Sequence, residues 1–296
     1  MEYHEINQSQ YSEIDTKLAN AFGEERSFYQ RMPSPESTTF HKAFRCTQEQ
    51  QEVGILTLWS RAVHDKVLYF NMLLFDSGST NQLEPILNKA FEISHERSLP
   101  LQAGHDVSHE QYLNFLSDNG FKVVMKTYEG TVGLHYSFVT KDVSLPERVV
   151  ATKLEALDKA AAAELSDLAL QKYADCHPHN PVVGSIYKEY WDRDMSSEAI
   201  NKQLSLCFKL EGKIIGYIIL EESDGDGELF LLDFWLAPAT TEQSQTYVEY
   251  AMSAMMNAGY EKLSFEADST DENLMRLLNL AGYPLDESQA FLTLQS

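Results

Sequence analysis

The hexapeptide FDSGST at residues 75–80 could support two different kinds of chemistry. Asp76, followed by serine and glycine, could be one carboxylate of a dyad that activates water. Gly78 could instead let the backbone approach a phosphate at the start of a helix, where free N–H groups point outward. A dyad of the aspartic protease kind needs two such loops, and the sequence contains one. The sequence therefore favours the phosphate-binding interpretation.

The residues after this loop have the spacing of an amphipathic helix. Asn81 and Glu84 are spaced as a capping box, and Pro85 suits the first turn of a helix. The apolar positions, spaced by three and four residues, are Leu83, Ile86, Leu87, Ala90 and Phe91. A strand, a loop and a helix are thus expected in this order.

Two other stretches resemble metal sites at first sight. DCHPHNP, residues 175–181, contains Cys176, His177 and His179, but the spacing matches no strong zinc pattern and the prolines indicate an irregular loop. DGDG, residues 224–227, lacks the remaining ligands of a calcium loop and is interpreted as a hairpin turn. No metal site is expected.

Composition limits the classes of function. The chain has 296 residues, enough for two domains, and 23 basic against 45 acidic residues give a formal charge of -22. This charge repels polyanions, so nucleic acid binding is not expected, whereas a cationic partner is compatible with it. Without a long apolar run or a secretory signal, no membrane association is expected. The cysteines Cys46, Cys176 and Cys207 are far apart, which suits a reducing cytoplasm.

Two pairs of glycines indicate an internal repeat. Gly54 and Gly216 each lie inside an apolar, β-branched strand, and Gly120 and Gly282 each follow an amphipathic helix. Both pairs are separated by 162 residues. The shared spacing predicts a duplicated fold.

The elements between the glycines agree with a duplication. Hairpin strands are expected at 55–59 and 67–75 in the first copy, and at 217–222 and 228–238 in the second. A helix, a strand, a second helix and terminal strands follow in each copy, and a first strand with helical segments precedes each hairpin. The stretch 141–148, with its proline, is interpreted as the linker.

This order resembles the GNAT superfamily of acyl-CoA-dependent N-acyltransferases over nearly the whole chain. The residues that carry the resemblance are GKIIGYIIL, LLDFWLAP and DENLMRLLNLAGY in the second copy, and EVGILTL and NGF in the first. The resemblance implies a mixed-sheet α/β (α+β) fold with two tandem GNAT-like domains, residues 1–143 and 148–296. It also implies acetyl-CoA (coenzyme A) as cosubstrate and an amine as acceptor.

The family's phosphate loop follows its fourth strand with the pattern Q/R-x-x-G-x-G/A. In the first copy it falls on Phe75, Gly78 and Thr80, so one glycine is kept; in the second copy no glycine remains, and Glu242 would bring a negative charge. The residues that the resemblance assigns to cofactor binding are Ser77, Gly78, Ser79, Thr80, Asn81, Thr240 and Thr241.

The resemblance also assigns candidate catalytic positions. Asp233, a carboxylate embedded in an apolar strand, is the candidate general base, and Asn71 at the same place in the first copy cannot act as a base. The family often has a tyrosine in its last helix that acts as a general acid and protonates the departing thiolate. The corresponding residues here are Leu116 and Leu278. An active enzyme would need another acid, or none.

Two functional hypotheses follow. The first is an N-acetyltransferase that transfers an acetyl or acyl group from acetyl-CoA to an amine of a small molecule or peptide. The alternative is a catalytically degenerate GNAT-fold module for binding or assembly. The sequence leaves open the acceptor, the acyl chain, the oligomeric state and the catalytic copy, because the better loop lies in the first copy and the better base in the second.

Overall fold

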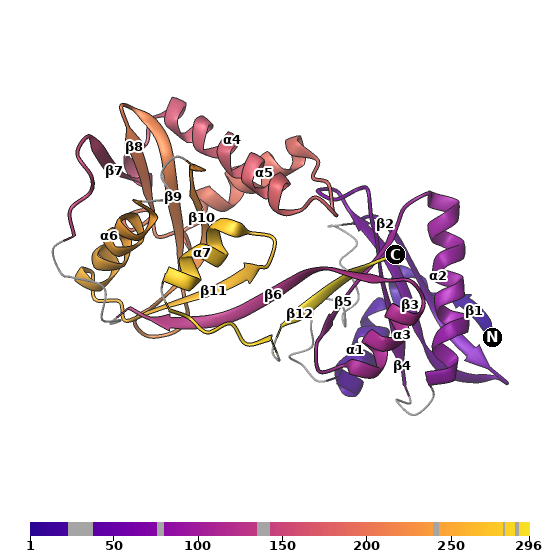
Figure 1. The fold of residues 1–296 in the computed structure, drawn as a ribbon. Coiled ribbons are helices and arrows are strands. Elements are labelled where there is room, and N and C mark those ends of the chain that lie inside the picture. The colour runs from indigo at the N-terminus through magenta and orange to yellow at the C-terminus, as the bar shows by residue number, and fades with distance from the viewer. Residues whose placement is uncertain (23–37, 76–79, 135–142, 239–242, 281, 288–289) are drawn as a thin grey trace. The chain divides into compact units, whose positions relative to one another are not determined.

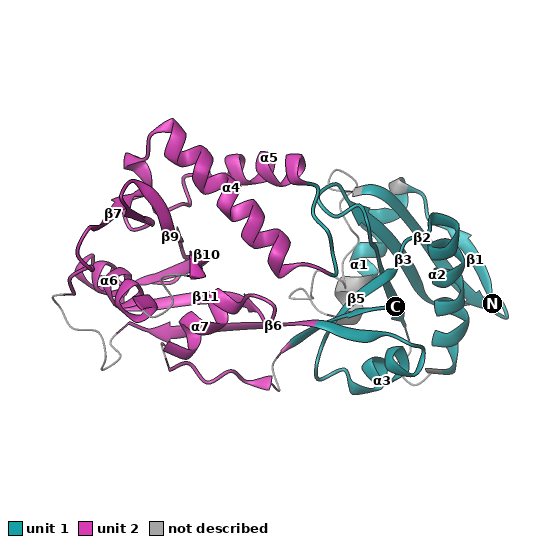
Figure 2. Ribbon diagram, turned by 45° about the horizontal axis from the view of Figure 1, so that its top comes forward, with its two compact units in different colours: residues 1–124, 179–183, 291–296 teal, residues 125–178, 184–290 magenta. Residues whose placement is uncertain are grey.

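The structure, a computed structural model, describes residues 1–22, 38–75, 80–134, 143–238, 243–280, 282–287 and 290–296. The chain forms two compact units (Figure 2). Unit 1 comprises Met1–Val124, His179–Val183 and Phe291–Ser296, and unit 2 comprises Met125–Pro178 and Gly184–Ala290. The expected mixed α/β fold class is confirmed. No helix in the described part of the chain is long and apolar enough to cross a membrane.

Unit 1 is built on a mixed sheet (Figure 1), and among its described strand pairs only β4 and β5 run parallel. Its strands, in spatial order, are β1 (Glu2–Glu5), β2 (Thr38–Gln48), β3 (Gln51–Arg61), β4 (Leu68–Leu74), β5 (Leu101–Asp106) and β12 (Phe291–Gln295). Its helices are η1 (Gln8–Gln10), α1 (Tyr11–Phe22), η4 (Thr80–Gln82), α2 (Leu83–Arg97) and α3 (Glu110–Asp118).

Alternating side chains of β4 explain how helices cover both faces of this sheet. Leu73 packs with Ile14 of α1, whereas Phe70 points to the other face and contacts Phe121 after α3. The predicted helix after residue 80 is confirmed as α2, with Pro85 in its first turn. The predicted capping box is wrong: the N-cap is Gln82, without a side-chain cap, because Asn81 belongs to the preceding 3-10 turn η4.

Unit 2 repeats the same plan. Its strands, in spatial order, are β6 (Lys122–Gly133), β11 (Lys262–Asp268), β10 (Glu228–Leu236), β9 (Lys213–Glu222), β8 (Leu206–Leu210) and β7 (Val149–Lys153). Of the strand pairs described in unit 2, only β10 and β11 run parallel. Its helices are η5 (Leu154–Ala156), α4 (Lys159–Cys176), α5 (Gly184–Ser196), α6 (Ser244–Asn257) and α7 (Glu272–Leu280). The expected hairpin turn at DGDG lies between β9 and β10.

The repeated glycines have physical reasons. A side chain at Gly54 would collide with the carbonyl oxygen of Leu73 on the neighbouring strand, and one at Gly216 would collide with the side chain of Leu236. Gly120 and Gly282 have φ angles of 91° and 68°, in the left-handed region that favours glycine after a helix. Each pair therefore marks an equivalent backbone constraint in the two units.

Each unit is completed by a strand from the other half of the sequence. β12, at the end of the chain, pairs antiparallel with β5 in unit 1, and β6, which follows α3, pairs antiparallel with β11 in unit 2. The compact units therefore do not follow chain order. The division into 1–143 and 148–296 stays a prediction about the duplicated copies. Strand patterning shows which face of a strand is buried but not which neighbour it pairs with.

Candidate active site

The two parallel strands of unit 2 separate midway along their length. Pairing between β10 and β11 runs from Glu228 with Lys262 to Leu231 with Phe265, while β10 continues to Leu236. An irregularity in the pairing of β10 with β9, between Leu231 and Asp233, coincides with this separation. The end of β10 thus has backbone groups that do not pair with β11.

A pocket of about 400 Å³ lies beside the free end of β10. It is formed by the end of β10, the end of α4 and the start of α7. Its lining residues are Trp235, Leu236, Pro238, Lys172, Asp175, Cys176, Thr270, Glu272, Asn273 and Arg276. It combines apolar walls with groups of both charges.

Asp233 lies next to this pocket in a buried network of ion pairs. Lys172 Nζ is 2.5 Å from Asp233 Oδ1 and 2.5 Å from Asp271 Oδ2. The Tyr217 hydroxyl donates to Asp233 Oδ2 at 2.9 Å, and the N–H of Phe234 donates to Asp233 Oδ1 at 2.9 Å. Lys172, Asp233 and Asp271 are called the charged triad below.

The charged triad connects three elements of unit 2. Lys172 comes from α4, Asp233 from β10, and Asp271 precedes α7, where its carboxylate accepts from the N–H groups of Asn273 and Leu274 at 3.1 and 3.0 Å. The Asn273 side chain in turn accepts from the N–H of Leu236 at 3.1 Å. These bonds fix the end of β10 against the start of α7.

The two carboxylates of the charged triad keep the Lys172 ammonium protonated. Burial alone would lower the pKa of Lys172, but Asp233 and Asp271 outweigh it, and the pKa lies above its usual value. Burial, followed by the charge of Asp233, raises the pKa of Tyr217 well above its usual value, so its hydroxyl remains a donor. The triad combines one basic and two acidic side chains, so its formal charge beside the pocket is negative.

The contacts of Asp233 account for its burial without any catalytic role, so its assignment as a general base stays a prediction. Leu116 and Leu278, where the family often has a tyrosine, are both fully buried in the cores of their units. Sequence reasoning missed Lys172 and Asp271. Asp271 carried a usable signal, an aspartate just before a helix that it caps, whereas nothing in helix α4 distinguished Lys172.

The predicted cofactor-binding residues are only partly described by the structure. Ser77, Gly78, Ser79, Thr240 and Thr241 lie outside the described residues. Thr80 begins η4, and Asn81 is exposed in the same turn, directly before α2. Their role in binding acetyl-CoA therefore stays a prediction.

The DCHPHNP segment ends α4 and continues as an irregular stretch, as expected. His177 Nε2 is 3.3 Å from Asp268 Oδ2, and burial raises the pKa of Cys176 to about 12, so its thiol stays protonated. No group of three or more His, Cys, Asp or Glu residues in the described ranges could hold a metal ion.

The equivalent place in unit 1 is neutral. Asn71, on β4, is 1% exposed, and it lies beyond the last parallel pair of β4 and β5, Tyr69 with Gln102. Thr57 is its register partner on β3. Neither the Asn71 amide nor the Thr57 hydroxyl has a hydrogen-bond partner in the described part of unit 1. The parallel strands separate in both units. In unit 2 the charged triad lies at this separation, whereas unit 1 has the neutral Asn71 there.

The overall fold resembles that of solved GNAT proteins. A GCN5-related N-acetyltransferase from Sphaerobacter thermophilus matches with a TM-score of 0.58 and 12% identity, covering 86% of this chain and 80% of that one. A tandem GNAT protein from the clavulanic acid biosynthesis pathway matches with a TM-score of 0.57 and 10% identity, covering 100% of this chain and 98% of that one. No known family profile and no curated protein sequence matches the chain.

The chain therefore has the GNAT fold, and a tandem GNAT protein resembles it over the whole length. The resemblance inferred from the sequence is confirmed at the level of the fold. At these identities the similarity establishes no activity and no substrate.

Proposed function

We propose that the chain is an acyl-CoA-dependent N-acyltransferase whose reaction site lies in unit 2. It transfers an acetyl or acyl group from acetyl-CoA to an amine of a small molecule or peptide. The observation that carries the proposal is the separation of β10 from β11 after Leu231, with the pocket of about 400 Å³ at the free end of β10.

The residues around this pocket suit a coenzyme A thioester. Arg276 is one of the lining residues, and a guanidinium group can pair with a phosphate. Helix α6 has no acidic residue in its first turn and its N-cap Gln243 makes no side-chain cap, which favours an anion at this helix end, whereas Glu242, directly before Gln243 in the sequence, opposes it. In unit 1, by contrast, Glu84 lies in the first turn of α2. Thr240 and Thr241 precede α6 and are retained as phosphate-binding candidates.

In this proposal acetyl-CoA supplies the activated thioester, and the residues of this chain bind the amine and move its proton. The negative charge of the triad attracts an ammonium group to the pocket. Asp233 takes the proton from this group, directly or through a water, so that the neutral nitrogen can attack the carbonyl carbon. After the attack the nitrogen loses its second proton to water, and the departing thiolate takes a proton from water, because Leu278 offers none.

The test measures coenzyme A release by the full chain with acetyl-CoA and a panel of amines. Turnover by the wild type is expected, and Asp233→Asn is expected to lower kcat about 100-fold or more while acetyl-CoA affinity is unchanged. Asp167→Asn, which changes a carboxylate in an exposed ion pair, is the matched control. Unchanged kcat in Asp233→Asn would refute the base assignment, and absence of acetyl-CoA binding at millimolar concentration would refute the function.

A second candidate is a GNAT-fold module that binds without catalysis. Two observations favour it: three donors already occupy Asp233, and the buried Leu116 and Leu278 stand where the family often has a tyrosine that acts as the acid. This candidate predicts acetyl-CoA or amine binding without turnover for any amine. Measurable acetylation that Asp233→Asn abolishes would exclude it.

The predicted environment is part of the proposal. The cysteines, Cys46, Cys176 and Cys207, are all buried and free, which supports a reducing cytoplasm. The net charge of -22 supports an amine rather than a nucleic acid as the partner.

A further inference from the structure

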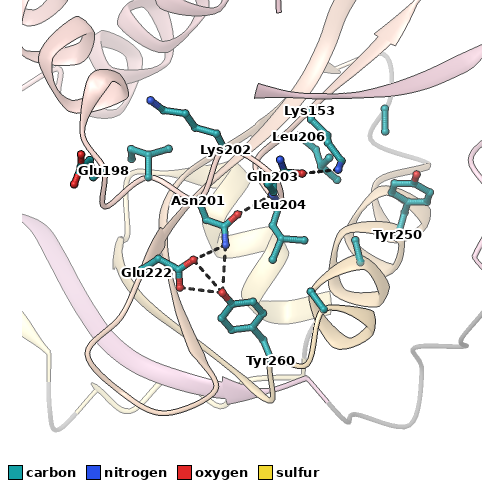
Figure 3. Close-up of a pocket in the computed structure, with 14 residues that line it drawn as sticks. Lys153, Glu198, Asn201, Lys202, Gln203, Leu204, Leu206, Glu222, Tyr250 and Tyr260 are labelled. Carbon is teal, nitrogen blue, oxygen red and sulfur yellow. Dashed lines mark hydrogen bonds between the residues drawn. The ribbon is translucent and has the colours of Figure 1, made fainter. Parts of the chain in front are cut away.

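A second pocket of unit 2 lies away from the separated strands. It has a volume of about 660 Å³, within the range of small-molecule sites, and shares no lining residue with the pocket beside β10. Its walls come from β7, the segment before β8, the end of β9 and the C-terminal half of α6 (Figure 3). We call it the α6 pocket.

A carboxylate in a fixed orientation lies in the α6 pocket. The Tyr260 hydroxyl donates to both oxygens of Glu222, at 3.0 and 2.9 Å, and the Asn201 amide donates to Oε1 at 2.7 Å. Figure 3 shows these three side chains converging within the pocket. The donors are neutral, so they orient the carboxylate without cancelling its charge.

The orientation of Asn201 is itself determined by the backbone. Its Oδ1 accepts from the N–H of Leu204 at 2.9 Å, so the NH₂ group must face Glu222. Its own N–H donates to the carbonyl of Leu220 at 2.8 Å. Burial, and then the bond to Glu222, raise the pKa of Tyr260, so its hydroxyl remains protonated at neutral pH. The arrangement is therefore preorganised for a ligand of Glu222.

No cation in the described ranges neutralises Glu222. Among the residues that the structure describes, no salt bridge involves this carboxylate. The basic residues of the pocket are engaged or directed elsewhere: Lys153 donates to Gln203 Oε1 at 2.7 Å, and the ammonium of Lys202 points away from Glu222 in Figure 3. The Glu222 carboxylate is therefore available to form an ion pair with the ammonium group of a ligand.

The rest of the α6 pocket combines apolar and aromatic residues with the polar side chains of Lys153, Glu198, Lys202 and Gln203. Ile200 and Leu206 are buried beneath it, and α6 contributes Ala254, Ala258 and the ring of Tyr250. A ligand therefore needs an apolar body beside its charged group. A divalent metal is a poor alternative, because the described ranges contain no cluster of three or more potential ligands.

From this geometry we propose that the α6 pocket binds a small organic ammonium with an apolar body. The ammonium group of the ligand donates to the Glu222 carboxylate, which Tyr260 and Asn201 orient. The apolar body packs against Tyr250, Ile200 and Leu206. The site is distinct from the pocket of the proposed reaction. Its affinity decreases with salt, because an exposed ion pair is screened.

The experiment titrates the full chain with 2-phenylethylammonium and with the neutral isostere 2-phenylethanol, by calorimetry at low salt. Saturable binding of the ammonium alone is expected. Glu222→Gln, which keeps an acceptor for Tyr260 and Asn201, should weaken binding about tenfold or more, and Tyr260→Phe should weaken it a few fold. Glu261→Gln, the same charge change at an exposed residue outside the pocket, should have no effect. Thermal unfolding of each variant reports whether it is folded.

The variants also separate this site from the proposed acceptor site. Binding that survives Asp233→Asn but not Glu222→Gln supports the α6 pocket, whether or not the chain acetylates amines. Binding lost in Asp233→Asn and kept in Glu222→Gln would place the amine beside β10 and overturn the inference. Equal binding of the alcohol and the ammonium, or no binding of either, would also overturn it. If Glu222→Gln does not fold, the Tyr260→Phe titration decides.

Discussion

Asn71 and Asp233 lie at equivalent places in the two units, on a strand that has just separated from its parallel neighbour, yet their surroundings are opposite. Asp233 accepts from Lys172, Tyr217 and the backbone. The Asn71 amide is buried, and both its nitrogen and its oxygen lack a hydrogen-bond partner among the described residues. One unit keeps a charged, fully bonded group, and the other keeps a neutral polar residue without bonds.

The difference separates two uses of the same backbone. A buried charge is tolerated only when partners hold it in place, so the charged triad of unit 2 is both costly to break and rigid. An unsatisfied buried amide costs about 1–3 kcal/mol in the folded state. The Asn71 amide therefore lowers the stability of unit 1 at the place where unit 2 has the ordered charged triad. This difference is a further reason for placing the proposed chemistry in unit 2.

The largest effect is expected from a substitution that disrupts the charged triad of unit 2. Lys172→Met removes the ammonium between Asp233 and Asp271 and leaves two buried carboxylates facing each other. The free energy of unfolding should fall by about 3–5 kcal/mol, measured by urea denaturation. Lys188→Met, which breaks the exposed pair with Asp167, is the control and should cost less than about 1 kcal/mol. Equal losses would show that the triad contributes no more than a surface pair.

The second prediction concerns a buried base in unit 1. Burial, with a smaller contribution from His109, lowers the pKa of His105 from 6.5 to about 3. The unfolded chain protonates this imidazole below about pH 6.5 and the folded chain only near pH 3, so stability falls as the pH falls between these values. The slope is at most that of one proton, about 1.4 kcal/mol per pH unit.

The measurement is the free energy of opening of amides in unit 1, obtained from hydrogen exchange between pH 6.5 and 3. His105→Phe, whose ring can keep the contact with Tyr112 at a centroid distance of 4.0 Å in the wild type, should flatten the pH dependence. The Asp233→Asn variant changes unit 2 and should leave the slope of unit 1 unchanged. A slope that persists in His105→Phe would assign the proton to another group.

The sequence predicted the features that depend on local spacing. Gly54 and Gly216 marked the repeat because each lies where a neighbouring strand leaves no room for a side chain, and the apolar positions Leu83, Ile86, Leu87 and Ala90 of α2 are buried as their spacing predicts. It did not predict that β12 pairs with β5, or that Lys172 lies between Asp233 and Asp271, because both depend on contacts between residues far apart in the chain. A capping box was expected at Asn81, but an extra 3-10 turn moved the start of the helix to Leu83.

A substitution of moderate effect tests the neutral side of the comparison. Asn71→Leu replaces an unbonded amide by an apolar group of similar size, so it should raise the free energy of unfolding by about 1–2 kcal/mol. Asp233→Leu, the matched change in unit 2, should lower it, because Lys172 loses one of its two carboxylates. Urea denaturation of the two variants measures both signs. A destabilising Asn71→Leu would show that the amide has a partner in solution.

The smallest expected effect concerns the stability of unit 2 at low pH, through Asp268. Burial alone would raise the pKa of Asp268, but hydrogen bonds from His177 and Thr127 outweigh it and lower the pKa below 3.8. A carboxylate with a lowered pKa stabilises the folded state above pH 3.8, and this contribution is lost as the pH falls through the folded value. The free energy of opening of amides in unit 2, obtained from hydrogen exchange, should therefore fall only below about pH 3.8, where unit 1 has already lost most of the contribution of His105. Asp268→Asn should remove this acid-side dependence and leave that of unit 1 intact, and an acid-side slope unchanged in Asp268→Asn would assign it to the charged triad instead.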